Sequence, residues 1–261
     1  MSKCTHLKLI PSAMPRVASR SLSLVVAGAV LLSIGVGAPA LADKKEEKAQ
    51  MLVERATATV DMFASDPRFT YFYDGYLKTA KGFLVIPSMA KGGFVVGGSK
   101  GRGVLIAKDV DSEDWNGPAF YTLGGASIGL QAGGKSSEIL MIVTSDRGLN
   151  RLLNSGAKLG GDLSVAVGNL GEGMGSADVR ADIIAFSRSK GFFGGASLEG
   201  SIVNVSQSRN QAYYGETLMP SDILVRGRGE NEGADGLVGS VETITTIDHS
   251  QAASPEDEAG D

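Results

Sequence analysis

The stretch S-K-G-F-F-G-G-A-S-L-E-G, residues 189–200, is the part of the chain that says most about its fold. Four glycines divide a largely apolar segment that has no arrangement typical of a nucleophile or a metal site. The runs on either side, residues 181–187 and 196–208, are rich in β-branched residues or alternate apolar with polar side chains. Because glycine permits positive φ angles and close backbone packing, we predict a pair of strands joined by a hairpin or bulge.

Further blocks of sequence belong to the same pattern. They are A-K-G at 80–82, I-P at 86–87, G-G-F-V-V-G-G-S-K-G-R-G-V at 92–104, W-N-G-P-A-F at 115–120, G-A-S-I-G-L-Q-A-G at 125–133, K-L-G-G-D-L-S-V-A-V-G at 158–168, Y-Y-G at 213–215 and S-D-I-L at 221–224. Together with residues 189–200, these blocks resemble the SYLF domain family, also called the Ysc84 actin-binding domain family, over residues 55–226.

This resemblance implies a non-enzymatic module that binds lipids. Eukaryotic members of the family recognise phosphoinositides and the yeast members bind actin. Neither ligand suits a secreted chain of bacterial type, so we expect only the general property, which is binding to anionic phospholipid or to a membrane surface. A structural or protein-interaction domain with no specific lipid ligand stays open as the alternative.

The first 42 residues have the features of a secretory signal peptide. Four basic residues accompany an uncharged apolar run at 22–37, and Ala40-Leu41-Ala42 supplies the small-x-small pattern for cleavage before Asp43. An uncleaved membrane anchor is the alternative, because the apolar run approaches the length of about 18 residues that spans a bilayer. Cleavage predicts a secreted, periplasmic protein that meets the membrane as a peripheral protein.

Cysteine and histidine are scarce, which excludes several kinds of site. Beyond residue 42 the chain holds no cysteine and one histidine, His249, so disulfides, thiol catalysis and Cys/His zinc sites are excluded. Residues 43–226 contain 20 basic and 20 acidic side chains, so no overall positive field points to nucleic acid. Residues 227–261 hold nine acids, and we expect an acidic, disordered tail in which only 238–247 has the pattern of a short strand.

The remaining patterns predict one α+β domain over residues 43–226. Apolar residues at helical spacing between Asp43 and Asp66-Pro67 predict an amphipathic N-terminal helix, with shorter helices at 74–81 and 146–159. Strands are expected at 82–86, 92–98, 102–108, 118–123, 126–132, 138–144, 162–168, 179–187 and 196–208. Since glycines inside strands allow bulges and bends, we expect a strongly curved antiparallel sheet, barrel- or sandwich-like, packed against these helices.

One motif argues for an enzyme. Residues 129–136, G-L-Q-A-G-G-K-S, match the phosphate-binding loop of nucleotide hydrolases, which needs a helix directly after it. The next residues, S-E-I-L-M-I-V, have the composition of a strand, so we expect Gly133-Gly134-Lys135 to form a hairpin turn and keep nucleotide binding as a remote alternative. No catalytic residue, metal site or cofactor is predicted; the acidic run at 109–114 is interpreted as a solvated hairpin tip.

Two groups of cations are the candidate lipid-binding residues. The first is on the N-terminal helix, where Glu46 and Glu47 interrupt Lys44, Lys45 and Lys48. The second comprises Lys78, Lys81, Lys91, Lys100 and Arg102, with no acid between residues 75 and 108. Near them lie the aromatic residues Phe69, Tyr71, Phe72, Tyr73, Tyr76 and Phe83, which either contact lipid head groups or belong to the core.

Overall fold

One curved sheet organises the molecule. The computed structural model describes residues 37–93, 96–109, 112–128, 133–168, 180–189, 192–194 and 198–246. In this part of the chain the sheet has nine strands: β1 (Gly82–Gly93), β2 (Val96–Lys108), β3 (Trp115–Ile128), β4 (Gly133–Val143), β5 (Ala157–Lys158), β6 (Val165–Val167), β7 (Ile183–Ser189), β8 (Phe192–Gly194) and β9 (Ile202–Val205). Their order is β5-β9-β3-β2-β1-β4-β7-β6, with β8 paired to β7.

The sheet curls into a half-barrel, which confirms the predicted α+β class. All strand pairs are antiparallel except β6 with β7, which run parallel, so the sheet is mixed rather than purely antiparallel. The predicted pairing of residues 181–187 with residues 196–208 is wrong. β7 pairs instead with β8, which lies in the glycine-rich segment itself, and Ser187 lies opposite Gly194. The strand in the run at 196–208 is β9, which pairs with β3.

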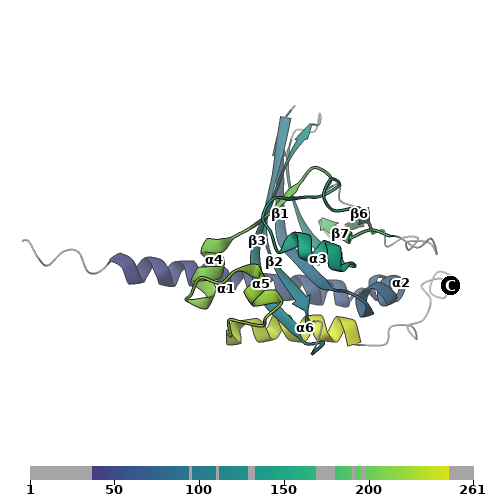
Figure 1. The fold of residues 1–261 in the computed structure, drawn as a ribbon. Helices are drawn as coiled ribbons and strands as arrows, with labels where there is room; N and C mark the ends of the chain where they lie inside the picture. The colour runs from purple at the N-terminus through teal and green to yellow at the C-terminus, as the bar shows by residue number, and fades with distance from the viewer. Residues whose placement is uncertain are drawn as a thin grey trace, which may run out of the picture. The chain divides into compact units, whose positions relative to one another are not determined.

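The helices cover both faces of the sheet. They are α1 (Gly37–Ala64), α2 (Pro67–Lys78), α3 (Asp146–Leu152), α4 (Gln207–Tyr214), α5 (Pro220–Leu224) and α6 (Asp235–Thr246), with a short 3-10 turn η1 (Glu232–Ala234) before α6. In Figure 1, α6 runs beside α1 and α2. Alternate residues of the long strands face two cores, one shared with these three helices and one shared with α3 and α5.

The aromatic residues near the second lysine group belong mainly to the first of these cores. Phe69, Tyr73 and Phe83 are fully buried, and the Phe69 and Tyr73 rings pack against Phe186 at centroid distances of 4.9 and 4.5 Å. The structure therefore favours the core interpretation for these three residues over contact with lipid head groups. Tyr71, Phe72 and Tyr76 are half-buried.

The break between the first two helices lies where the sequence predicts it, but the second helix begins earlier. Asp66 accepts hydrogen bonds from the backbone N–H groups of Arg68 and Phe69, at 2.9 and 3.3 Å, and Pro67 opens α2. The dipeptide that stops α1 therefore also starts α2, since aspartate caps a helix and proline suits its first position. The predicted helix at 74–81 therefore begins too late. It also ends too late, because α2 ends at Lys78.

The long strands do not break at their glycines. β3 is continuous from Trp115 to Ile128, although the sequence predicted two strands there. The predicted hairpin turn at residues 133–135 is also wrong, because Gly133, Gly134 and Lys135 pair with Gly93, Gly92 and Lys91 within the sheet. No helix follows them, so the described part of the nucleotide-loop motif lacks the helix that the motif requires. Residues 129–132 lie outside the described residues.

The largest correction concerns the region after residue 226. The predicted disordered tail over 227–261 contains η1 and α6, and the side chains of Leu237, Val241 and Ile244 are buried in the core. These three follow the i, i+4, i+7 spacing of a helix, which the glycines and acids around them obscured. The folded domain therefore extends to Thr246, and no strand forms at 238–247 in the described residues up to Thr246. Residues 247–261 lie outside the described part.

The expected signal peptide falls almost entirely on residues that are not described. Residues 1–36 lie outside the described ranges, and α1 begins at Gly37, ahead of the expected helix start at Asp43. From Ala40 onward the chain is one unit. None of the described helices is long and apolar enough to cross a membrane.

Candidate functional site

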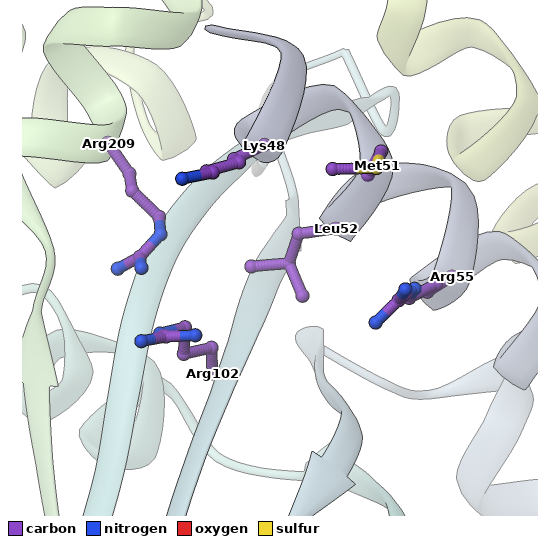
Figure 2. A pocket seen from close by; sticks show the side chains of 6 residues that line it. All are labelled: Lys48, Met51, Leu52, Arg55, Arg102 and Arg209. Carbon is purple, nitrogen blue, oxygen red and sulfur yellow. The ribbon is translucent and has the colours of Figure 1, made fainter. Parts of the chain in front are cut away.

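A cationic pocket lies where α1, β2 and α4 meet. It has a volume of about 390 Å³ and is lined by Lys48, Met51, Leu52, Arg55, Arg102 and Arg209. Figure 2 shows Lys48, Arg102 and Arg209 directed toward the same space, with Leu52 between them and Arg55. Four of the six lining side chains are cationic and none is acidic, so the pocket combines a concentrated positive charge with an apolar wall.

Helical spacing places one wall of the pocket. Lys48, Leu52 and Arg55 follow the i, i+4, i+7 pattern and therefore share one face of α1. The neighbouring face carries Ala49, Val53 and Ala56, all fully buried against the sheet. Burial of this second face fixes the rotation of α1, and that rotation brings the first face to the pocket.

Strand alternation places Arg102. It lies two residues before Val104 and four before Ile106, whose side chains are buried in the core shared with α1. Because alternate residues of a strand point to the same face, the exposed Arg102 emerges on the α1 side where that core ends. Arg102 is opposite Ser88 on β1, next to the register shift between Val85 and Ser88.

Arg209 is positioned by contacts of α4 with β3. The backbone N–H of Phe120 donates to Asn210 Oδ1 at 2.8 Å, and Asn210 is fully buried. One turn later, the Tyr213 ring packs on the Phe120 ring at 5.1 Å. These two contacts hold α4 against the sheet, and Arg209, next to Asn210, then projects over the pocket (Figure 2). Its Nη1 donates to Ser206 Oγ at 2.9 Å.

Among the described residues, no carboxylate forms an ion pair with a cation of the pocket. Ion pairs among the described residues involve other cations: Arg68, Lys78, Lys81, Lys108, Arg147, Arg151, Arg188, Arg226 and Arg228. None of these pairs includes a residue of the pocket. Partial burial, and then the charge of Arg102, lower the pKa of the Arg209 guanidinium. The protein therefore holds two guanidinium groups together at an energetic cost that a bound anion would relieve.

The structure brings together only part of the predicted cation set. Lys48 and Arg102 line the pocket, and Lys44, four residues before Lys48, lies on the same face of α1. Lys100 shares the face of Arg102 because it lies two residues earlier on β2. Lys45 is exposed on α1 but is not part of the pocket lining.

The other three predicted cations lie elsewhere. Lys78 Nζ is 2.8 Å from Asp74 Oδ2 on the same helix, and Lys81 Nζ is 3.4 Å from Asp146 Oδ1. Lys91 is two residues after Met89, which is buried in the other core, so it points to the opposite face of the sheet. These three residues therefore do not contribute to the pocket.

Two cations of the pocket, Arg55 and Arg209, were not among the candidate residues predicted from the sequence. Arg55 could have been found, because it lies seven residues after Lys48 on a predicted helix. Arg209 could not, because residues 207 and 208 were assigned to a strand, and only the packing of α4 on β3 brings Arg209 to β2.

A second charged cluster, around Asp182, is structural. This buried carboxylate accepts hydrogen bonds from Arg147, from Ser145 Oγ at 2.7 Å, and from Ser164 N and Oγ at 2.9 and 2.6 Å. The hydrogen bond from Arg147 is the main reason why the pKa of Asp182 lies well below its usual range. Asp182, which lies just before β7, thus stays ionised and joins the start of α3 to Ser164, which lies just before β6. Within the described ranges, no group of three histidine, cysteine or acidic side chains could hold a metal ion.

Comparison with known proteins identifies the family. The model of the family described as "Ysc84: Las17-binding protein actin regulator" matches residues 124–244, from the end of β3 through nearly all of α6. The chain belongs to the Ysc84 family. Because the match ends at residue 244, it includes α6 in the family domain, in agreement with the packing of that helix.

Curated relatives of the Ysc84 family come from fungi and animals. Protein YSC84 of Saccharomyces cerevisiae is 32% identical over 195 residues, which cover 69% of this chain and 40% of that protein. LAS seventeen-binding protein 3 of the same yeast is 32% identical over 154 residues, covering 57% and 33%. Human SH3 domain-containing YSC84-like protein 1 is 34% identical over 149 residues, covering 56% and 43%. The chain thus corresponds to less than half the length of each of these relatives.

Proposed function

We propose that this Ysc84-family chain is a non-enzymatic module that binds anionic phospholipid, with the head group in the cationic pocket. The observation that carries the proposal is the convergence of Lys48, Arg55, Arg102 and Arg209, without an ion-pairing carboxylate among the described residues. Arginine and lysine near an anionic membrane surface contribute about 1 kcal/mol each to binding. Four such side chains in one cavity would therefore contribute about 4 kcal/mol to binding at a membrane that exposes anionic lipid.

The apolar side chains of the pocket favour a lipid over a simple soluble anion. Met51 is 39% exposed at the edge of the pocket, and Leu52 lies in its wall. A head group that is neutralised by the cations would place its glycerol and the start of its acyl chains against these two residues. Exposed apolar side chains beside cations are typical of helices that lie in a membrane interface.

The cellular setting forms part of the same proposal. The basic start of the chain, the apolar run at 22–37 and Ala40-Leu41-Ala42 support export by a signal peptide. We therefore assign the protein to the periplasm, as a peripheral protein of the cell envelope.

A protein partner is the second candidate, and the comparisons favour it. The matching family is described as a Las17-binding actin regulator, and one relative is named for binding Las17. An acidic surface of a protein would suit the same four cations. In that case the pocket would be a docking site and its affinity for lipid would be incidental.

Vesicle binding tests the first candidate. The protein should co-sediment with vesicles that contain phosphatidylglycerol and should ignore vesicles of phosphatidylcholine alone. Arg102→Glu should weaken binding by about tenfold or more, since it replaces an attraction of about 1 kcal/mol with a repulsion. Arg180→Glu is the matched control, because Arg180 is an exposed cation outside the pocket and its substitution changes the net charge equally. If both variants lose the same amount of vesicle binding, the loss reflects the net charge of the protein and not the pocket.

Native mass spectrometry supplies an independent test. The purified protein should carry co-purified phospholipid, and Arg102→Glu should remove it. A protein that is free of lipid and also ignores anionic vesicles would rule out the first candidate and leave the protein partner.

A further inference from the structure

The sequence after α6 carries a charge pattern complementary to the pocket. Residues 255–261 read P-E-D-E-A-G-D, with four carboxylates at Glu256, Asp257, Glu258 and Asp261, and the last cation of the chain is Arg228. The pocket holds four cations that form no ion pair among the described residues. The two groups are therefore equal in number and opposite in sign, and both belong to one chain.

None of the carboxylates of α1 whose side chains the structure describes lines the pocket. Glu47 and Glu54 lie seven residues apart and so share a face of this helix, and both are exposed. Neither lines the pocket, and Glu54 Oε1 accepts a hydrogen bond from Gln50 at 3.3 Å. An anion for the pocket must therefore come from another part of the chain or from a ligand.

The fold allows the acidic segment to return to the pocket. Gln50 Nε2, between two pocket residues of α1, donates to the carbonyl oxygen of Gly233 at 3.3 Å, so α6 begins beside the pocket helix. The 12 residues of α6 then lead about 18 Å away. Residues 247–255 can span about 30 Å when extended. This reach covers the length of α6 back toward the pocket and most of the distance around α1.

We propose that the acidic segment Glu256–Asp261 docks in the cationic pocket and competes with the anionic head group. This inference rests on the proposed function, because it treats the pocket as the lipid site. The segment acts as an internal competitor: it occupies the pocket when no anionic head group is bound and is displaced at a surface that presents many anionic head groups at once. A tethered ligand of this kind reaches effective concentrations in the millimolar range, so a weak contact is sufficient.

Chemical cross-linking tests the contact directly. A water-soluble carbodiimide joins an amine and a carboxylate that touch, through an amide bond. In the full chain, the expected product links Lys48 to Glu256, Asp257 or Glu258, and 0.5 M NaCl should suppress it because the contact is electrostatic. Absence of any link between α1 and residues 256–261 at low salt would overturn the proposal.

Vesicle binding tests the competition. The variant Glu256→Gln, Asp257→Asn, Glu258→Gln, Asp261→Asn should bind phosphatidylglycerol vesicles about three- to tenfold more tightly than the unchanged chain at low salt, and the gain should disappear when Arg102→Glu and Arg209→Glu are added. The matched control neutralises four exposed acids in loops outside the pocket, Glu113, Asp114, Glu199 and Glu216. An equal gain in affinity in the control would mean that the acids act only through general repulsion between the protein and the vesicle. This result would overturn the proposal.

Failure of this inference is distinguishable from failure of the proposed function. If the unchanged chain binds the vesicles and neutralising residues 256–261 alters nothing, only the internal competitor is rejected. If neither the unchanged chain nor the neutralised variant binds them, the lipid function itself is rejected, and the cross-link then decides by itself whether the segment occupies the pocket.

Discussion

Arg102 on β2 and Arg209 on α4 line the same cavity, and partial burial followed by the charge of Arg102 lowers the pKa of Arg209. The two residues are far apart in the chain, and the described residues offer neither of them an ion pair with a carboxylate. Two like charges held together in this way reduce the stability of the free protein and favour the binding of an anion.

We expect Arg102→Gln to leave the free protein as stable as the unchanged chain, or to raise its Tm slightly, because it removes the repulsion with Arg209. A ligand that binds only the folded state stabilises it by about 1.4 kcal/mol when its concentration is ten times its Kd. Pyrophosphate should therefore raise the Tm of the unchanged protein by a few degrees and leave that of the variant unaltered. Thermal melts with and without the anion check both expectations, and an equal shift in the two proteins would contradict them.

Asp182 should make the fold sensitive to acid. Arg147 and its other donors lower the folded-state pKa of Asp182, so its contribution to stability is complete above the unfolded value of about 4 and is lost as the pH falls below it toward the folded value. Asp182→Asn should cost about 2 kcal/mol at pH 7, because Arg147, Ser145 and Ser164 lose a charged hydrogen-bond acceptor. Urea unfolding at several pH values measures this, and the difference between the two proteins should narrow below pH 4. A constant difference would contradict the assignment.

The cap of α2 should have a measurable effect on stability. Asp66→Ala removes the acceptor for the N–H groups of Arg68 and Phe69 and should lower the free energy of unfolding by about 1 kcal/mol. Asp61→Ala, an exposed position inside α1, serves as the control and should change stability by less than half as much. Chemical denaturation of both variants separates a capping effect from the general loss of an aspartate.

The helix α6 should be essential to the domain. Leu237→Ala removes a fully buried side chain and should cost about 3 kcal/mol. A chain that ends at Arg226 should lose the cooperative unfolding transition, since the core around α1 would lie open. Circular dichroism during heating tests both, and a chain ending at Arg226 that melts like the full chain would contradict the role of α6.

Local patterns predicted the elements whose signals are strong and short-range. The spacing of Val53, Ala56 and Val60 predicted α1, and Asp66-Pro67 predicted its end, because helical periodicity and capping depend on neighbours within a few residues. The strand β7 was predicted from its β-branched residues, but its partner was not, because β8 lies in the glycine-rich segment that was predicted to be a turn. The glycines of β3 led to the wrong prediction of two strands, because the sequence does not reveal that the neighbouring strands β2 and β9 hold this strand extended.

Sequence patterns were sufficient to predict the family, the α+β class and the main helix, and to place Lys48 and Arg102 in a candidate cation set. The tertiary structure alone decided that α6 belongs to the core and that Lys78, Lys81 and Lys91 lie away from the pocket. It also decided that Arg209 joins Arg102 and Lys48. The physical reason is that the pocket depends on the packing of α1, β2 and α4, which are far apart in the chain, whereas the sequence patterns report only on residues a few positions apart.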